Sequence, residues 1–205
     1  MHKSKRYPHS HRQHSQSSKV ARSVAAKLTA MTECQSVFTF DLAGNPLPLW
    51  DEGVWENTED WQAELTPLMS ELSRCDGFVV ISPELSGMVP AGLKNLFLLC
   101  ANGELANKPA YIIGVSAGEG GTYPVAELRS SSYKNSRICY IPEHLIVRRV
   151  EKVFNDNAEN NDERSHNYLS SRMDFGLAML CTYAAALAPA RRSGALDIGD
   201  YPHGM

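Results

Sequence analysis

The chain has 205 residues, 43% of them apolar and 21% charged, with a formal net charge of −3. This length suits one α/β domain with a full core. The charge gives no reason to expect nucleic acid or an anionic membrane as a partner, and no run approaches the roughly 18 apolar residues of a membrane span. The five cysteines lack any zinc or cluster spacing, so we expect reduced thiols in a cytoplasmic protein.

The first part of the chain is predicted to contain a helix, a strand and a long loop. Residues 1–18 are polar and read as a tail or loop, and apolar residues at helical spacing then predict a helix over 18–32. The segment 36–42 (SVFTFDL) is typical of a strand. Residues 43–57 contain two prolines and two glycines and are predicted to be irregular.

The middle of the chain repeats the alternation of helix and strand. Apolar residues spaced four, three and four apart between residues 61 and 72 predict one buried helix face, and Pro67 after Thr66 predicts that the main helix begins there. The apolar run 78–82 (FVVIS) predicts a strand buried on both faces. A helix over 90–100 follows.

The last part predicts two further strands and two helices. A second buried strand is expected at 110–115, followed by a glycine-rich loop over 116–123 and a helix over 124–133. A short strand at 138–141 and a long helix over 165–188 complete the pattern. Strands that alternate with helices predict one open parallel sheet with helices on both faces.

The loops that follow the strands are the expected functional region. Right-handed crossovers bring them to one edge of the sheet, where ligands bind outside the carboxyl ends of the strands. Residues 10–18 carry four hydroxyls and Arg12 directly before a predicted helix, a pattern typical of phosphate binding. The glycines of residues 116–123 allow close backbone approach to a ligand, but their spacing is neither a P-loop nor a dinucleotide fingerprint.

The histidines of the N-terminal segment are the one candidate metal site. His9, His11 and His14 are close in sequence, but no obvious partner ligands accompany them. An unligated histidine run is the preferred interpretation, and we predict no metal.

Two stretches carry a family resemblance. They are Asp76–Glu84, a strand that ends in Pro-Glu, and Pro90–Asn95, which has the pattern Pro-x-x-Leu-Lys-Asn. With Ser10-x-Arg12-x-x-Ser15, they resemble the NAD(P)H-dependent FMN reductase family, flavodoxin-like flavoproteins that include quinone, azo-dye and chromate reductases.

The resemblance implies a flavodoxin-like three-layer α/β/α fold with an open parallel sheet. It places the FMN-binding domain at residues 10–190, between a polar segment 1–9 and a tail 191–205. It also implies a homodimer or homotetramer that uses NADPH or NADH as co-substrate and a small electron acceptor.

The resemblance also implies the site residues, none of them an acid–base catalyst. The FMN phosphate is expected at Ser10, Arg12, Ser15 and Ser17. The isoalloxazine is expected to be bordered by Pro83, Glu84, Leu85, Ser86, Gly87, Ser116, Ala117, Gly118 and Gly121.

The chain departs from the family pattern in two places. The family has an apolar central strand that ends in glycine before Ser10, whereas residues 2–9 here are polar, contain Pro8 and end in His9. The first strand is therefore poorly encoded: either the sheet accepts a poor strand, or the protein begins differently from the printed sequence. In addition, Leu85 and Ser86 replace the Tyr and Asn of the family loop.

Three hypotheses therefore stand. The first is an FMN-dependent NAD(P)H oxidoreductase that reduces a small acceptor such as a quinone or free flavin. The second is a degenerate relative with a weak or lost flavin site that acts as a binding protein. The third, an unrelated domain for a phosphorylated ligand, rests only on the general position of binding sites in such sheets.

Overall fold

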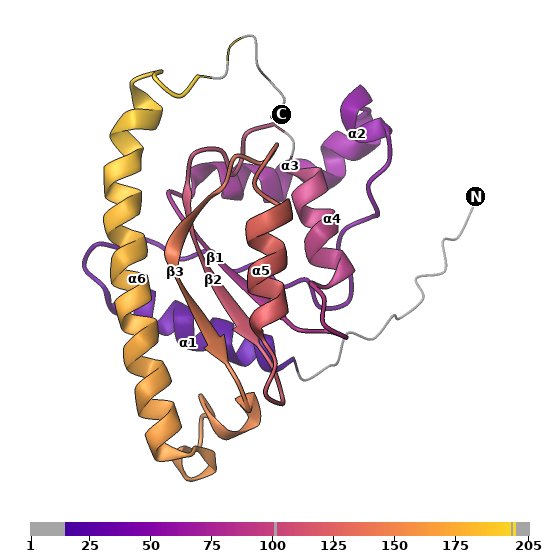
Figure 1. Cartoon of the computed structure of the whole chain (residues 1–205). Helices are drawn as coiled ribbons and strands as arrows, with labels where there is room; N and C mark the ends of the chain where they lie inside the picture. The colour runs from indigo at the N-terminus through magenta and orange to yellow at the C-terminus, as the bar shows by residue number, and fades with distance from the viewer. Residues whose placement is uncertain (1–14, 101, 198, 200–205) are drawn as a thin grey trace.

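A three-stranded parallel sheet forms the centre of the fold (Figure 1). The computed structural model describes residues 15–100, 102–197 and 199. The strands lie in the order β1-β2-β3 and comprise β1 (Phe78–Pro83), β2 (Pro109–Val115) and β3 (Cys139–Val147). This open parallel sheet confirms the predicted flavodoxin-like fold class.

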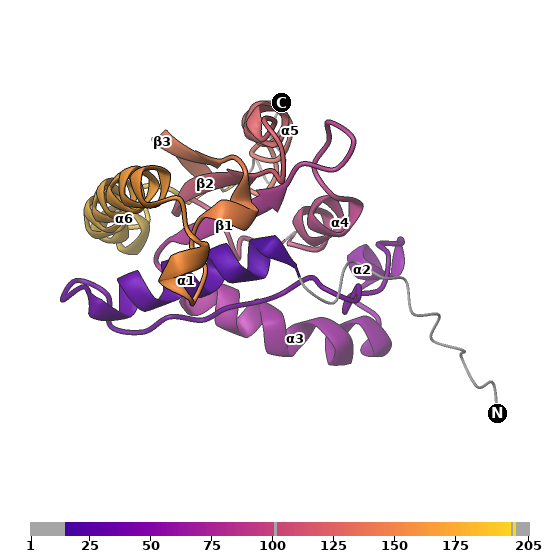
Figure 2. The same ribbon diagram turned by 90° about the horizontal axis from the view of Figure 1, so that it is seen from below.

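Helices cover both faces of the sheet (Figure 2). Along the chain they are α1 (Gln16–Ala30), α2 (Gly53–Glu56), α3 (Glu59–Arg74), α4 (Ala91–Leu99), α5 (Thr122–Ser131), the 3-10 turns η1 (Val150–Lys152) and η2 (Ala158–Asn160), and α6 (Glu163–Arg192). The core clusters place α1 and α6 on one face and α4 and α5 on the other. The predicted three layers are therefore present.

Strand β2 is the most deeply buried element, as its apolar run predicts. All seven of its residues are buried. Tyr111 and Ile113 pack in the cluster that contains α1 and α6, whereas Ile112 packs with α4 and α5. On α6, Gly176 allows the close approach of Tyr111, since a Cβ at this position would lie 2.3 Å from the Tyr111 Cζ atom.

The predicted start of the helix before β1 is wrong. Helix α3 begins at Glu59 and continues through Pro67 rather than beginning at Thr66. Proline cannot donate a backbone hydrogen bond to the preceding turn. Pro67 therefore leaves the Ala63 carbonyl without its usual N–H donor. One residue earlier, the Thr66 hydroxyl donates to the Gln62 carbonyl at 2.6 Å.

The predicted strand over residues 36–42 is also wrong, so the sheet has three described strands instead of four. Residues 34–42 contain no strand, helix or turn, and no backbone hydrogen bond joins them to a strand in the described part of the chain. A strand composition alone does not make a strand, because pairing requires a neighbour at hydrogen-bonding distance.

Strand β3 is longer than predicted. It continues past the predicted end at Ile141 to Val147, which pairs with Val115 at the end of β2.

Helix α6 is long and apolar enough to qualify as a membrane span by composition. Its Met173, Leu177 and Leu180 are instead part of the core cluster against β2 and β3, as in a layer helix of a globular domain.

Candidate functional site

The predicted site residues fall in three segments, 10–18, 83–87 and 116–121, and the described parts of these segments meet at the carboxyl edge of the sheet. Ser15 and Ser17 at the start of α1, Pro83 to Leu85 after β1, and Ala117 after β2 line one cavity of about 1730 Å³. The right-handed crossovers explain this convergence, because each parallel strand ends at the same edge. The edge is therefore the candidate functional site.

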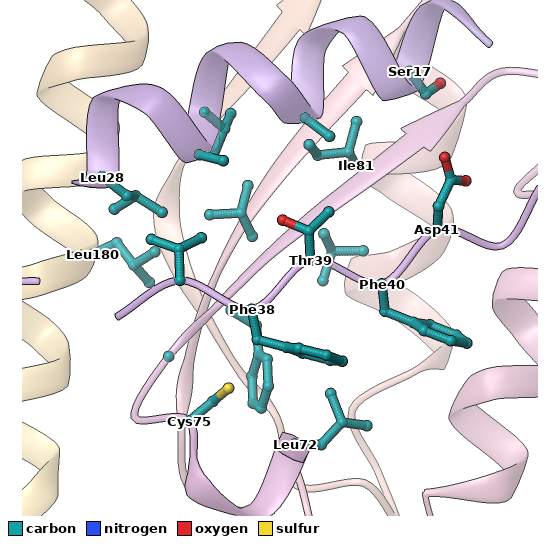
Figure 3. Close-up of a pocket in the computed structure, with 18 of the residues that line it drawn as sticks. Ser17, Leu28, Phe38, Thr39, Phe40, Asp41, Leu72, Cys75, Ile81 and Leu180 are labelled. Atoms are coloured by element: carbon teal, nitrogen blue, oxygen red, sulfur yellow. The ribbon is translucent and has the colours of Figure 1, made fainter. Parts of the chain in front are cut away.

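The N-terminus of α1 offers hydroxyl groups at this edge. Ser15 is the N-cap, and its Oγ accepts a hydrogen bond from the Ser18 N–H at 3.3 Å. The Ser18 hydroxyl donates to Asp41 Oδ2 at 2.5 Å. Ser17 and Asp41 lie near each other at one end of the cavity (Figure 3). The helix dipole favours an anion here, whereas the Asp41 carboxylate opposes one.

Asp41 is a residue of the site that the sequence prediction did not include. In the sequence, only its position indicates the site, because Asp41 lies at the end of an extended segment that reaches the same edge of the sheet as β1. The Asp41 side chain also accepts the Ala43 N–H at 2.9 Å, which fixes the turn after that segment.

A tight turn after β1 presents apolar side chains to the solvent. Ser86 and Gly87 both have positive φ, 50° and 75°, as the central residues of a type I′ turn require. Leu85 and Met88 exchange backbone hydrogen bonds of 3.1 and 3.0 Å across the turn. Their side chains are 44% and 52% exposed, which is a large exposure for apolar residues at a candidate site.

Glu84 joins the loop after β1 to the loop after β2. Its Oε2 accepts the Gly121 N–H at 2.6 Å and the Tyr123 N–H at 3.4 Å, so the carboxylate caps the N-terminus of α5. A Cβ on Gly120 would lie 2.6 Å from Glu84 Oε1. The carboxylate therefore sets the distance between the two loops.

The loop after β2 is also held against the strand that precedes it. A Cβ on Gly114 would lie 2.1 Å from the Gly121 carbonyl oxygen, and Gly121 itself has a φ of 102°. On the outer side, the Arg148 guanidinium donates to the Glu119 carbonyl at 2.6 Å. These contacts therefore fix the position of the loop relative to the sheet.

The structure brings together some of the predicted site residues. Those that line the cavity are Ser15, Ser17, Pro83, Glu84, Leu85 and Ala117. The remaining described ones lie in the same loops without lining it, namely Ser86, Gly87, Ser116, Gly118 and Gly121. Ser10 and Arg12, like the three neighbouring histidines, lie outside the described residues.

The described groups fit FMN chemically. Serine hydroxyls and free N–H groups at a helix N-terminus suit a phosphate, and the exposed apolar groups of Leu85 and Met88 suit the face of a flat ring. The cavity of about 1730 Å³ exceeds the roughly 300–1,000 Å³ that small-molecule sites usually occupy, so its volume does not exclude a flavin.

Comparison with known proteins adds a family match and a fold match. The model of the NADPH-dependent FMN reductase family matches residues 9–152. None of the curated proteins matches the chain significantly.

Three of the solved structures with a similar fold are oxidoreductases. FerB, a flavoenzyme NAD(P)H:(acceptor) oxidoreductase from Paracoccus denitrificans, is 21% identical with a TM-score of 0.64, and the match covers 87% of this chain and 94% of that one. The apo form of the NADH:FMN oxidoreductase EMOB is 14% identical with a TM-score of 0.58, over 87% and 86%. An oxidoreductase from Corynebacterium diphtheriae is 16% identical with a TM-score of 0.56, over 82% and 86%.

Proposed function

The chain belongs to the NADPH-dependent FMN reductase family, whose cofactor is FMN and whose co-substrate is NAD(P)H, and from this premise we propose that it reduces a small acceptor such as a quinone or free flavin. FMN supplies the redox chemistry when bound. The protein holds the phosphate, borders the ring and leaves one side open to the nicotinamide and the acceptor.

The meeting of the three loops carries this proposal. Ser15 and Ser17 would hold the phosphate from α1, together with Ser10 and Arg12. Residues 83–87 would border one side of the ring, and residues 116–121 the other. Support comes from the shared cavity and from the Glu84 contacts that set the two ring-bordering loops relative to each other.

A second candidate function has its own support. A relative with a weak flavin site, acting as a binding protein, is favoured by the Asp41 carboxylate at the end of the cavity where the phosphate would bind. A negative charge at that position lowers the affinity for a phosphate dianion. The affinity for FMN therefore separates the two functions.

The test is a titration of the purified protein with FMN, followed by NADPH and NADH oxidation with a quinone. We expect a yellow protein, saturable FMN binding and acceptor-dependent oxidation. Tight FMN binding without turnover, or no binding at all, would contradict the proposed reaction.

A pair of variants localises the cofactor. Leu85→Asp places a charge in the cavity against the ring, and we expect FMN binding at least tenfold weaker. Leu98→Asp is the matched control, because Leu98 is 59% exposed on α4 and does not line the cavity. Equal affinities for the two variants would place the flavin elsewhere.

We propose further that the protein is cytoplasmic and forms a homodimer or homotetramer. Large apolar side chains remain exposed on one subunit, among them Trp55 on α2 and Phe175 on α6. Such groups are enriched at subunit interfaces. Sedimentation velocity of the purified chain tests this, and a monomer at micromolar concentration would contradict it.

A further inference from the structure

A buried lysine lies in the first turn of α1, close in sequence to the serines of the candidate site. Lys19 is only 9% exposed, although lysine is among the residue types least often buried without partners. Its Nζ donates hydrogen bonds to the Val150 carbonyl and to Asn155 Oδ1, both at 2.7 Å. These acceptors come 131 and 136 residues later in the chain. The lysine therefore joins the start of α1 to the segment that follows β3.

The side chain of Asn155 is held in the orientation that this contact needs. Its Nδ2 donates to the Glu151 and Asn160 carbonyls at 2.9 and 3.0 Å. Its backbone N–H donates to Asn161 Oδ1 at 2.9 Å. Because the NH₂ group faces two carbonyls, the amide oxygen is the atom that remains to accept from Lys19. Asn155 is therefore a fixed anchor for the lysine.

The other acceptor, Val150, connects the lysine to the loop after β2. Val150 lines the cavity of the candidate site, and its N–H donates to the Ser116 carbonyl at 3.1 Å. The neighbouring Arg149 N–H donates to the Gly118 carbonyl at 3.0 Å. Arg149 has a φ of 45°, and such backbone strain persists only where surrounding contacts hold it. Two successive hydrogen bonds thus run from Lys19 through Val150 to Ser116.

The apolar contacts of α1 do not fix its first turn in the same way. Val20 and Val24 bury one face of the helix in the core. Apolar packing is not directional, so it allows the helix to shift along its axis more easily than hydrogen bonds do. Two hydrogen bonds to one ammonium group carry requirements of distance and angle. Lys19 is therefore suited to set where the start of α1 lies at the edge of the sheet.

We propose that Lys19 is a positioning residue for FMN binding: it holds Ser15 and Ser17 at the distance from the loop after β2 that the phosphate and the ring of one FMN molecule require. This inference rests on the proposed placement of the phosphate at these serines. The lysine acts without touching the cofactor, since its ammonium group is directed to Val150 and Asn155. The loop after β2 keeps its own contacts to Glu84 and Arg148. Loss of the lysine should therefore affect the phosphate end of the ligand and spare the ring end.

The experiment compares FMN with riboflavin, which has the same ring and no phosphate. Both are titrated into the full chain and followed by flavin fluorescence. Lys19→Met keeps an unbranched apolar side chain and removes the ammonium group. We expect FMN binding at least fivefold weaker than in the wild type, and riboflavin binding within twofold. Equal losses for the two ligands would assign Lys19 to general stability and would overturn the proposal.

Lys27 provides a matched control on the same helix. It lies about two turns further along α1, and its Nζ donates to Asp174 Oδ1 on α6 at 2.6 Å. This lysine also joins α1 to a distant segment, but at the end away from Ser15 and Ser17. We expect Lys27→Met to leave both affinities within twofold. A loss of FMN binding as large as that of Lys19→Met would overturn the proposal.

A second measurement needs no flavin. We expect backbone hydrogen exchange in the first two turns of α1 to be faster in Lys19→Met than in the wild type, and exchange in residues 116–121 to be unchanged. Unchanged exchange at the start of α1 would overturn the proposal. Circular dichroism checks that the variants are folded. If Lys19→Met does not fold, Lys19→Gln, which is uncharged but keeps an N–H donor, enters the same comparisons with the same expected order of affinities.

The wild-type titrations keep this inference apart from the proposed function. A wild type that does not bind FMN would contradict the proposed function and this inference with it. Equally tight binding of FMN and riboflavin would overturn the phosphate placement and this inference, and would leave the flavin reaction standing. A wild type that prefers FMN, together with equal affinities of Lys19→Met and Lys27→Met, would overturn this inference alone.

Discussion

Strands β1 and β2 lie side by side and have similar apolar sequences, yet their burial differs. Every residue of β2 is buried, whereas Ser82 alone is fully buried in β1. The difference follows from their neighbours, because β2 lies between two strands, whereas β1 pairs with β2 alone among the described residues. Composition thus determines which segments are able to form the core, and the presence of a second neighbour determines whether they do.

The largest expected effect is in a pair of isoleucines in register on the two strands. Ile113 of β2 is 0% exposed, and its neighbour Ile81 of β1 is half-buried. We expect Ile113→Ala to lower the free energy of unfolding by about 2–5 kcal/mol. Ile81→Ala should cost clearly less, because part of its surface is already open to water. Urea unfolding measures both. Equal costs for the two variants would show that the two strands do not differ in burial in solution.

An intermediate effect is expected at Glu84, which joins the loop after β1 to the loop after β2. Glu84→Ala removes the acceptor for the Gly121 and Tyr123 N–H groups, so the loops that border the proposed flavin lose their common anchor. We expect FMN binding about tenfold weaker, equivalent to about 1.4 kcal/mol. Isothermal titration calorimetry measures the change.

The control for Glu84 is an acid in the neighbouring loop. Glu119 pairs with Arg149 at the surface, where both side chains are largely exposed. Such pairs contribute little, so Glu119→Ala should change FMN affinity less than twofold. A similar loss for both variants would assign the effect to charge and not to loop position.

The smallest expected effect is at Glu127 on α5, a helix that packs against the fully buried strand β2. A hydrogen bond from Lys94 and a second from the Val89 N–H lower the pKa of Glu127 from 4.5. Because the folded pKa is lower than the unfolded one, this stabilisation is present above pH 4.5 and is lost as pH falls through the folded value. Glu127→Gln should remove under about 1 kcal/mol at pH 7 and flatten the acid side of the stability profile, as urea unfolding at several pH values will show.

The sequence predicts the elements whose signals are local. The runs 78–82 and 110–115 read as buried parallel strands and are β1 and β2, since such strands are apolar on both faces. The helices α1, α4, α5 and α6 follow from apolar periodicity. Residues 36–42 have a strand composition but lack a strand neighbour among the described residues, a condition that no local pattern encodes.

The same distinction applies to the site: its loops could be predicted from the sequence, and its long-range contacts could not. The glycines and the Pro-Glu stretch indicate which loops border the site, because turns require particular residues. The carboxylate contacts of Glu84 and Asp41 join residues 37 and 23 positions apart. They depend on how strands and helices are placed in space, and the sequence alone gives no sign of them.

The close approach of Gly114 to Gly121 has a consequence for protein engineering. Neither position accepts a side chain without moving the backbone, so mutations that retune substrate preference must occur elsewhere. The side chains of Leu85 and Met88 face solvent and tolerate exchange. A library that varies these two positions and keeps both glycines should therefore retain folded members while it changes which acceptors the protein admits.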